Sequence, residues 1–445
     1  MENIVRGIIG VFAIIGIAFL FSNNKKRINW RLVGTGLGIQ FILAIFILKS
    51  EELSNFFSPL GWPKLLFEYM AGFFVVVLKY TSEGANFLFG FLGHGPEYPD
   101  SVGVIFAFQV LPTIIFFASL TAILYHYGVL QFIVKILSKG MQKLLGTSGA
   151  ETLSVISNIF VGQTEAPLVI KPFIDKMTKS ELLTVMTGGM ATIAGGVMAA
   201  YVAMLGTSFA TANGLEIEVA QQLFAERLLG ASLMAAPAAL VIAKILYPET
   251  EESVTAGSLN MVVEKTDANG IDAAASGAGV GLHLALNVGA MLLAFIALLA
   301  MANGLFGWVS DLSGLSSLLG EPLSIEMILG WTLAPLAWIV GVPWADATTM
   351  GSLLGTKIVL NEFVAYLKLA GEVEAASISP KTIAMATFAL CGFANFSSIA
   401  IQIGGIGGLA PGRKSDLAKF GVKAVFAGTM ATLMTATIAG MLFTN

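Results

Sequence analysis

Long apolar runs recur through the whole 445-residue chain, and they constrain its fold more than any other feature. Each run is long enough for a helix to cross about 30 Å of hydrocarbon. Only 12% of the residues are charged, which is about half of the roughly 25% found in soluble domains. The chain is therefore predicted to be an all-α polytopic membrane protein with about eight transmembrane helices. The clearest runs cover residues 4–21, 32–48, 102–124, 280–301 and 418–443.

Basic residues predict how the chain lies in the membrane. A basic cluster of Lys25, Lys26, Arg27 and Arg31 follows the first apolar run, whereas a signal peptide is basic before its apolar core. The positive-inside rule therefore places this cluster in the cytoplasm, and the N-terminus and the C-terminus are both predicted to lie outside. Acidic segments fall on the outer side near Glu97 and Asp100 and near Glu372 and Glu374. The chain has no long N-terminal extension, which favours a bacterial-type inner membrane.

Two further segments carry weaker information. Residues 130–145 mix lysines with leucines and isoleucines, which is typical of an amphipathic helix at the membrane interface, although an ordinary solvated helix fits equally well. The long polar stretch at 248–277 is predicted to connect two halves of the chain in the cytoplasm.

Several kinds of function are disfavoured. The single cysteine, Cys391, rules out an intramolecular disulfide and a cysteine-based metal cage. The three histidines lack ligand spacing, and there is no basic tract of the kind that binds nucleic acid. The stretch at 407–415 resembles a phosphate-binding loop, but Arg413 stands where a lysine should follow the glycine. It is interpreted as a basic cytoplasmic turn.

Two apolar stretches broken by polar residues echo each other. The first contains NIFVGQTEAP and the second contains NEFVAY, so that each carries a glutamate, Glu165 or Glu362, in apolar surroundings. Each is followed by a helix that small and polar residues interrupt. Under the predicted orientation the first stretch has both ends inside and the second has both ends outside. Two oppositely oriented re-entrant hairpins, at about 150–175 and 345–371, indicate an inverted repeat with a transport site near the middle of the membrane.

Broken segments of this kind must face protein or a water-filled cavity, because unpaired amides and carbonyls cost several kcal/mol each in lipid. In the first hairpin Gly162 is predicted to end one half-helix and Pro167 to begin the next. A charged carboxylate at the centre of a membrane helix costs about 2.5–3.5 kcal/mol, so Glu165 and Glu362 are predicted to face a pathway. A protonated carboxyl hydrogen-bonded between helices remains an alternative for either residue.

The polar residues around the breaks limit the kind of ligand. They offer amides, hydroxyls and carboxylates but no arginine near either tip, whereas a phosphorylated or carboxylated ligand would need a bidentate cation. Asn395, Ser397 and Ser398 interrupt the second helix, and Phe393 could cover a ring. The glycines at 195–196 fit helix packing as well as function. The set suits a neutral ligand that is rich in hydroxyl and amide donors and contains a ring, such as a sugar–base compound.

Three segments, in this order and separation, resemble the signature segments of the concentrative nucleoside transporter family: GQTEAP, NEFVAY and CGFANFSS. Also similar to family segments are MTGGMATIAGG and YPETEES. The resemblance runs from about Gly146 to the end of the chain and is weak before it. It implies a homotrimer of eight-helix protomers in the lipid bilayer. In each protomer a mobile domain would carry nucleosides such as uridine or adenosine across like an elevator.

The resemblance also implies roles for individual residues. The substrate-binding residues would be Gln163, Thr164 and Glu165 with Val197 at the base, and Glu362, Asn395 and Ser398 with Phe393 at the ribose. A sodium ion would be held by Asn158, Thr192 and the carbonyls of Val161 and Ile193. Hydroxyl donors suit a carboxylate acceptor, and the carbonyls of unwound backbone suit a hard cation. The pair Thr192 and Asn158 favours sodium as the coupling ion, and proton symport through a glutamate at the same site is the alternative. No organic cofactor is expected.

The predicted division of the chain follows the repeat. We expect scaffold helices at 1–128, a first transport repeat with hairpin 1 at 129–247, a cytoplasmic connection and scaffold helix at 248–302, and a second transport repeat with hairpin 2 at 303–445. A membrane enzyme acting on a lipid-linked substrate would need clustered carboxylates, which the sequence does not show. A channel would allow uptake without accumulation. The sequence therefore predicts a secondary active importer of nucleosides by sodium symport.

Overall fold

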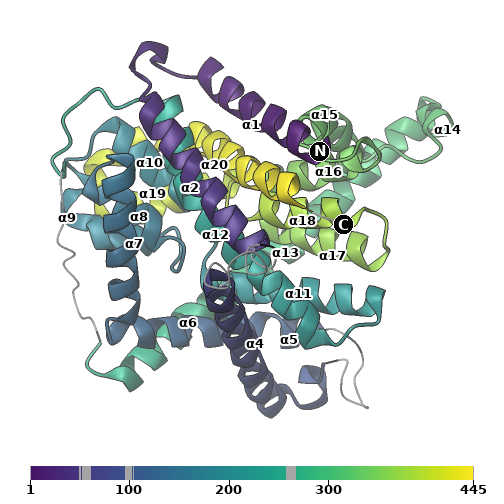
Figure 1. Ribbon diagram of the computed structural model, residues 1–445. Coiled ribbons are helices and arrows are strands. Elements are labelled where there is room, and N and C mark those ends of the chain that lie inside the picture. The colour runs from purple at the N-terminus through teal and green to yellow at the C-terminus, as the bar shows by residue number, and fades with distance from the viewer. Residues whose placement is uncertain are drawn as a thin grey trace.

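The computed structural model describes residues 2–49, 52, 62–95, 103, 105–256 and 267–443. Over these ranges its regular secondary structure is helical, without a β-strand (Figure 1). The acidic residues Glu97 and Asp100 lie outside the described residues, as does part of the predicted connection at 248–277. The all-α fold class is confirmed.

Eight helical stretches in the described ranges are long and apolar enough to cross a membrane. This number confirms the prediction of about eight transmembrane helices, and the five apolar runs seen in the sequence coincide with five of the stretches. The eight stretches contain α1 (Glu2–Leu20), α2 (Trp30–Leu48), α4 (Trp62–Phe89), α5 and α6 (Phe106–Gln109 and Leu111–His126), α10 and α11 (Lys179–Ala191 and Gly195–Asn213), α12 (Ile217–Leu246), α13 (Gly270–Leu312) and α20 (Lys414–Leu442).

The remaining helices are shorter. They are α7 (Val129–Leu145), α8 (Gly149–Ser157), α9 (Lys171–Ile174), α14 (Leu315–Leu319), α15 (Ile325–Ile339), α16 (Trp344–Val359), α17 (Glu362–Glu374), α18 (Pro380–Leu390) and α19 (Phe396–Leu409), with 3₁₀ turns η1 (Lys25–Arg27), η3 (Gly90–Gly93), η4 (Ala166–Ile170) and η5 (Pro411–Arg413). α7 is amphipathic, as predicted: Leu130, Val134 and Met141 are buried, whereas Lys135 and Lys139 are exposed.

The core of the protein lies around α12 and α20. In each of them 89% of the apolar membrane-spanning window is buried, against 17% in α13. α20 packs against α1, α10, α12 and α18 and runs through the middle of the molecule (Figure 1). α13 packs mainly along α6, where small residues allow a close approach: a Cβ added at Gly277 would lie 2.7 Å from the carbonyl oxygen of Ala118. The rest of the apolar α13 surface faces outward and is suited to contact lipid.

Two helical hairpins carry the predicted tips. The first consists of α8, a turn over 158–165, and the helical segment made by η4 and α9. The second consists of α16 and α17, which are separated only by Leu360 and Asn361. Asn361 is the N-cap of α17, and its side chain accepts a hydrogen bond from the backbone N–H of Val364 at 2.9 Å.

The first hairpin differs from its prediction at one residue. Pro167 lies in the first turn of η4, as predicted. Gly162, however, does not end a half-helix, because α8 already ends at Ser157. The next residue, Asn158, turns toward α10, where its side-chain amide donates to the carbonyl oxygen of Gly188 at 2.9 Å. After Ser157 the backbone tightens, because the N–H groups of Ile159 and Phe160 donate to the carbonyl oxygens of Ile156 and Ser157, three residues earlier, and the contact of Asn158 with a distant helix accompanies this change.

Each hairpin is followed by a broken helix. The breaks lie between α10 and α11 and between α18 and α19. The two breaks touch each other at Gly392, which has φ +100°. A Cβ at this position would lie 2.6 Å from the carbonyl oxygens of Met190 and Ala191. Only glycine combines this backbone conformation with such a close approach.

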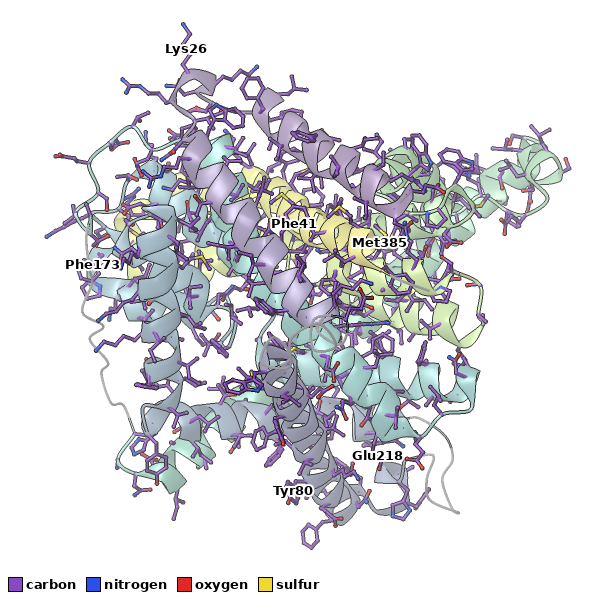
Figure 2. All side chains as sticks on the ribbon, in the orientation of Figure 1. Lys26, Phe41, Tyr80, Phe173, Glu218 and Met385 are labelled. Atoms are coloured by element: carbon purple, nitrogen blue, oxygen red, sulfur yellow. The ribbon has the colours of Figure 1, made fainter. Side chains whose placement is uncertain are left out.

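Both chain termini lie at one end of the molecule. α1 packs along α20, and Asn3 Nδ2 donates to the carbonyl oxygen of Phe443 at 3.3 Å. The basic segments lie at the opposite ends of these helices, where Lys26 projects from the loop after α1 (Figure 2). There Arg413 Nη1 donates to the carbonyl oxygen of Met177 at 2.6 Å, which joins the start of α20 to the end of the first hairpin.

Candidate functional site

The tip of the first hairpin is hydrogen-bonded to α19. Gln163 is buried, and its Nε2 donates to Ser398 Oγ at 3.2 Å. Its Oε1 accepts from Gln402 Nε2 at 3.0 Å. Gln402 Nε2 also donates to the carbonyl oxygen of Met186 in α10 at 3.0 Å. Paired polar groups thus hold this tip between the two broken helices.

The tip of the second hairpin presents a buried carboxylate. Glu362 begins α17 and is 5% exposed. Its Oε1 accepts from the hydroxyl of Tyr201 in α11 at 3.1 Å, and its Oε2 accepts from Asn395 Nδ2 at 2.9 Å. The Tyr201 ring stacks on Tyr366, with 4.2 Å between the ring centroids. The carboxylate is therefore held by neutral donors that come from both broken helices.

Asn395 links the two tips. It is the N-cap of α19, and its Oδ1 accepts from the backbone N–H of Ser398 at 2.8 Å and from Ser397 Oγ at 2.7 Å. This arrangement aims Asn395 Nδ2 at Glu362. Because Ser398 also bonds to Gln163, the first turn of α19 joins residues from both hairpins. The partial positive charge at a helix N-terminus favours the nearby carboxylate.

Four other predicted residues take no part in these side-chain hydrogen bonds. Glu165 is exposed and lies over Gly162, and no described residue forms an ion pair or a side-chain hydrogen bond with it. Thr164 lies between buried and exposed at the same tip. Val197 is buried in the first turn of α11, and Phe393 is half-buried in the second break. The structure leaves Glu165 outside the hydrogen-bonded network that joins the other polar residues.

The first break brings together the residues predicted to hold sodium. Asn158 Nδ2 donates to Thr192 Oγ1 at 2.7 Å, and the hydroxyl of Thr192 lies 3.0 Å from the carbonyl oxygens of Asn158 and Gly188. Asn158 Oδ1 is buried and has no hydrogen-bond partner among the described residues. The carbonyl oxygens of Val161 and Ile193 accept no hydrogen bond from the described part of the chain. Such oxygens are the ligands that hard cations prefer.

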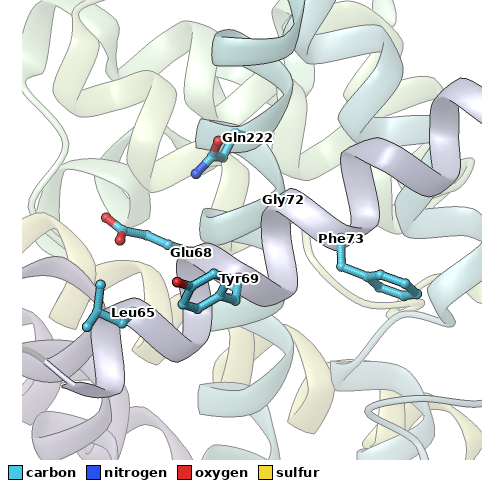
Figure 3. A pocket seen from close by; sticks show the side chains of 6 residues that line it. All are labelled: Leu65, Glu68, Tyr69, Gly72, Phe73 and Gln222. Atoms are coloured by element: carbon cyan, nitrogen blue, oxygen red, sulfur yellow. The ribbon is translucent and has the colours of Figure 1, made fainter.

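Two cavities lie away from this site. One of about 370 Å³ lies between α4 and α12 and is lined by Leu65, Glu68, Tyr69, Gly72, Phe73 and Gln222 (Figure 3). Another of about 270 Å³ lies between α13, α15 and α16. Neither is lined by a predicted site residue. At the hairpin tips the polar side chains bond to one another, so a ligand that binds there must replace those hydrogen bonds.

Sequence reasoning missed three residues of this region: Tyr201, Lys357 and Gln402. Lys357 and Gln402 could have been found from the sequence, because each is a lone polar or charged residue in an apolar stretch beside a signature segment. Tyr201 gave no such signal, because tyrosine is common at the ends of membrane helices and its depth cannot be read from the sequence.

Comparison with known proteins identifies the family. Three family models match successive parts of the chain: the N-terminal part of the Na⁺-dependent nucleoside transporters at 9–92, a nucleoside recognition or gate domain at 107–208, and the C-terminal part of the Na⁺-dependent nucleoside transporters at 227–440. The chain is 45% identical to YutK, an uncharacterized transporter of Bacillus subtilis, over 99% of both chains. It is 41% identical to the nucleoside permease NupC of Helicobacter pylori, over 98% of this chain and 96% of NupC.

Solved structures agree with this assignment. CNTnw in an inward-facing, substrate-bound state is 42% identical with a TM-score of 0.85, and the match covers 99% of this chain and 100% of CNTnw. A variant of CNTnw in an outward-facing state gives a TM-score of 0.85 at 41% identity, over 99% of this chain and 98% of the variant. The chain therefore belongs to the concentrative nucleoside transporter family, as its signature segments predicted, and it is a membrane transporter rather than an enzyme.

Proposed function

We propose that the protein imports nucleosides by sodium symport and that Glu362 accepts hydrogen bonds from the ribose hydroxyls. The observation that carries this proposal is the buried carboxylate of Glu362, whose two oxygens accept from Tyr201 and Asn395 at 3.1 and 2.9 Å. Hydroxyl groups of a ribose are donors of the same kind and can take these places. The carboxylate would keep two charge-assisted hydrogen bonds when ribose hydroxyls replace Tyr201 and Asn395, so the exchange would cost little at Glu362.

The base of the nucleoside is proposed to lie against the first hairpin tip. The amide of Gln163 acts there as donor and acceptor at once, toward Ser398 and Gln402. A base edge also carries donors and acceptors, so the amide can turn from these partners to the ligand. Thr164 and Glu165 follow in the same tip and are proposed to extend this contact, with uridine and adenosine as substrates. Val197 would pack against the base, and Phe393 would pack beside the sugar.

Sodium is proposed to bind at the first break, between hairpin 1 and α10. The proposed ligands are Asn158 Oδ1, the hydroxyl of Thr192 and the carbonyl oxygens of Val161 and Ile193. A buried amide oxygen without a partner costs about 1–3 kcal/mol, and a cation would remove this cost. Asn158 and Val161 belong to the tip that also carries Gln163, so an ion bound here would order the tip that meets the base. This shared element would couple sodium binding to nucleoside binding.

The proposed orientation of the chain in the membrane rests on where its basic segments and its termini lie. Both termini lie at one end and the basic segments at the other. The positive-inside rule then supports termini outside and basic loops in the cytoplasm. Similarity to bacterial proteins such as NupC of Helicobacter pylori supports an inner membrane of bacterial type. We further propose a homotrimer in which the two hairpins and their broken helices move together past scaffold helices that include those at 1–128, as an elevator. The family resemblance supports the homotrimer and the elevator movement.

A nucleoside without the 2′ and 3′ ribose hydroxyls tests the proposed role of Glu362. We expect 2′,3′-dideoxyuridine to be transported at least about 100-fold less efficiently than uridine, because the buried polar partners would be left unpaired. Initial rates of uptake of each labelled compound into proteoliposomes, measured over a range of concentrations, give this ratio. Equal transport efficiency for the two compounds would show that the 2′ and 3′ hydroxyls are not recognised.

Thr192→Ala tests the proposed sodium site. The variant loses a proposed sodium ligand and should raise the sodium concentration for half-maximal uptake by at least about tenfold, since loss of even an outer-shell partner weakens metal binding by about 10- to 100-fold. Nucleoside recognition at saturating sodium should change much less. Thr184→Ala is a matched control, because Thr184 is buried in α10, which ends just before Thr192, and its hydroxyl donates to the carbonyl oxygen of Ser180 at 2.8 Å. An unchanged sodium dependence in Thr192→Ala would remove Thr192 from the ion site.

A further inference from the structure

Lys357 is a buried lysine beside the second helix break. It lies in the last turn of α16, the first arm of hairpin 2, and its exposed fraction is 0%. A charge taken out of water is costly unless it is paired or fully hydrogen-bonded. A lysine kept at this depth therefore calls for a role that an apolar side chain of similar size could not fill.

Three acceptors surround Lys357 Nζ. They are the carbonyl oxygens of Ala389 at 2.9 Å and Cys391 at 3.3 Å, and Thr432 Oγ1 at 3.2 Å. The Thr432 hydroxyl donates its own proton to the carbonyl oxygen of Thr429 at 3.1 Å, so it accepts from the lysine. An ammonium group has three N–H donors and no acceptor. The surroundings of Nζ match its charged form.

The two carbonyls belong to the C-terminal end of α18, where the break begins. The last carbonyls of a helix have no partner within the helix and carry a partial negative charge. The ammonium of Lys357 bonds to two of them, and the hydroxyl of Tyr366 donates to a third, that of Thr387, at 2.8 Å. Both donors come from hairpin 2, one from each arm. Hairpin 2 therefore supplies hydrogen-bond donors to the unpaired carbonyl oxygens at the C-terminal end of α18.

The first break is built differently. At the end of α10 the carbonyl oxygen of Gly188 accepts from Asn158 Nδ2 and from the Thr192 hydroxyl, which are neutral donors. Within the described ranges, no lysine or arginine side chain makes a hydrogen bond there. Under the proposed function, a transported sodium ion supplies the positive charge at this break. The second break has a positive charge that is covalently attached to the chain.

We propose that the ammonium of Lys357 is a fixed cation that binds the unpaired carbonyl oxygens at the second helix break. The transported sodium would do the same at the first break. Lys357 and Glu362 lie on the two arms of hairpin 2, one on each side of Leu360 and Asn361. The bonds of Lys357 to α18 therefore set the position of Glu362. Lys357 is a positioning residue that does not touch the substrate. The comparison with sodium rests on the proposed function, whereas the bonding of Lys357 to the end of α18 does not.

The test removes the ammonium group of Lys357 by mutation and supplies a small ammonium ion from solution in its place. Lys357→Ala removes the side chain beyond Cβ, and propylammonium has the size and charge of the missing part. We expect this variant to have a lower Tm and uridine uptake reduced by at least about tenfold, because three buried acceptors lose their donor. Propylammonium should raise both, and 1-propanol should raise neither. Lys357→Met keeps the bulk without the charge and should stay impaired with either additive. Exposed Lys419→Ala is the control and should respond to neither additive.

Two results would overturn the proposal. The first is uptake at the wild-type rate, with unchanged sodium dependence, by a folded Lys357→Met protein. The second is failure of propylammonium to raise the Tm of Lys357→Ala or to recover that variant in folded form, because the additive restores all three donors. The Tm measurement requires no transport. Absence of uridine uptake by the unmodified protein would therefore count against the proposed function and would leave the test of the fixed cation intact.

Discussion

Replacing Glu362 by glutamine should lower nucleoside uptake by at least about 100-fold while the protein stays folded. Each hydrogen bond to a charged group contributes about 1.5–3 kcal/mol, and about 1.4 kcal/mol corresponds to a tenfold change in rate. Two ribose hydroxyls that lose an ionised acceptor therefore account for the expected loss. Glutamine keeps the shape of the side chain, and its amide oxygen can still accept from Asn395 Nδ2. Uridine uptake into proteoliposomes, with Tm as the measure of folding, checks this result.

Glu374→Gln is a matched control for this variant. Glu374 lies in the same helix, α17, but is exposed, so its replacement should leave uptake unchanged. If Glu362→Gln and Glu374→Gln both transport uridine at the wild-type rate, Glu362 is not the ribose acceptor. The carboxylate would then be a structural group that joins Tyr201 to Asn395.

Gly392→Ala should destabilise the protein by about 2–6 kcal/mol and abolish uptake. Residues other than glycine are strained by about 1–3 kcal/mol at such a backbone conformation, here φ +100°. The new Cβ would also lie 2.6 Å from backbone oxygens of Met190 and Ala191, which cannot move without shifting the end of α10. Overpacking of this kind adds about 1–3 kcal/mol. A lowered Tm and low yield of folded protein are the expected observations.

Gly404→Ala supplies the comparison. Gly404 lies within α19, and a Cβ added there meets no atom within 4 Å. Alanine is favoured over glycine inside a helix by about 0.5–1 kcal/mol, so this variant should be as stable as the original protein or slightly more stable. A Gly392→Ala protein with the same Tm as Gly404→Ala would mean that the two helix breaks do not touch as the structure shows.

The fold could be predicted where one physical constraint acts alone. A membrane of fixed thickness demands apolar runs of fixed length, and for that reason the number of spanning helices was predictable. Polar residues inside such runs are costly, and for that reason the stretches around Glu165 and Glu362 stood out as hairpins. The hydroxyl and amide groups of Asn158 and Thr192 were recognisable in the same way. The structure places these two side chains in contact at 2.7 Å.

Features that depend on distant contacts could not be predicted. The prediction that Gly162 ends a half-helix was wrong, because α8 ends at Ser157 and the next residue, Asn158, donates a hydrogen bond to α10, a contact that no local pattern contains. The contact of Gly392 with the other break is equally remote in sequence. Tyr201 in α11 donates to Glu362 in α17, and its role depends on how these two helices pack. Local patterns thus identify the polar groups, and the packing of the helices decides which of them meet.

Uptake of radiolabelled uridine and adenosine into proteoliposomes tests sodium-coupled nucleoside import most directly. Three conditions are compared: an inward sodium gradient, an inward proton gradient, and no gradient. We expect both nucleosides to accumulate only with the sodium gradient. Accumulation with the proton gradient alone would contradict sodium coupling at Asn158 and Thr192 and would move attention to the buried Glu362. Absence of uptake of either nucleoside, from protein shown to be folded, would contradict the proposed substrate.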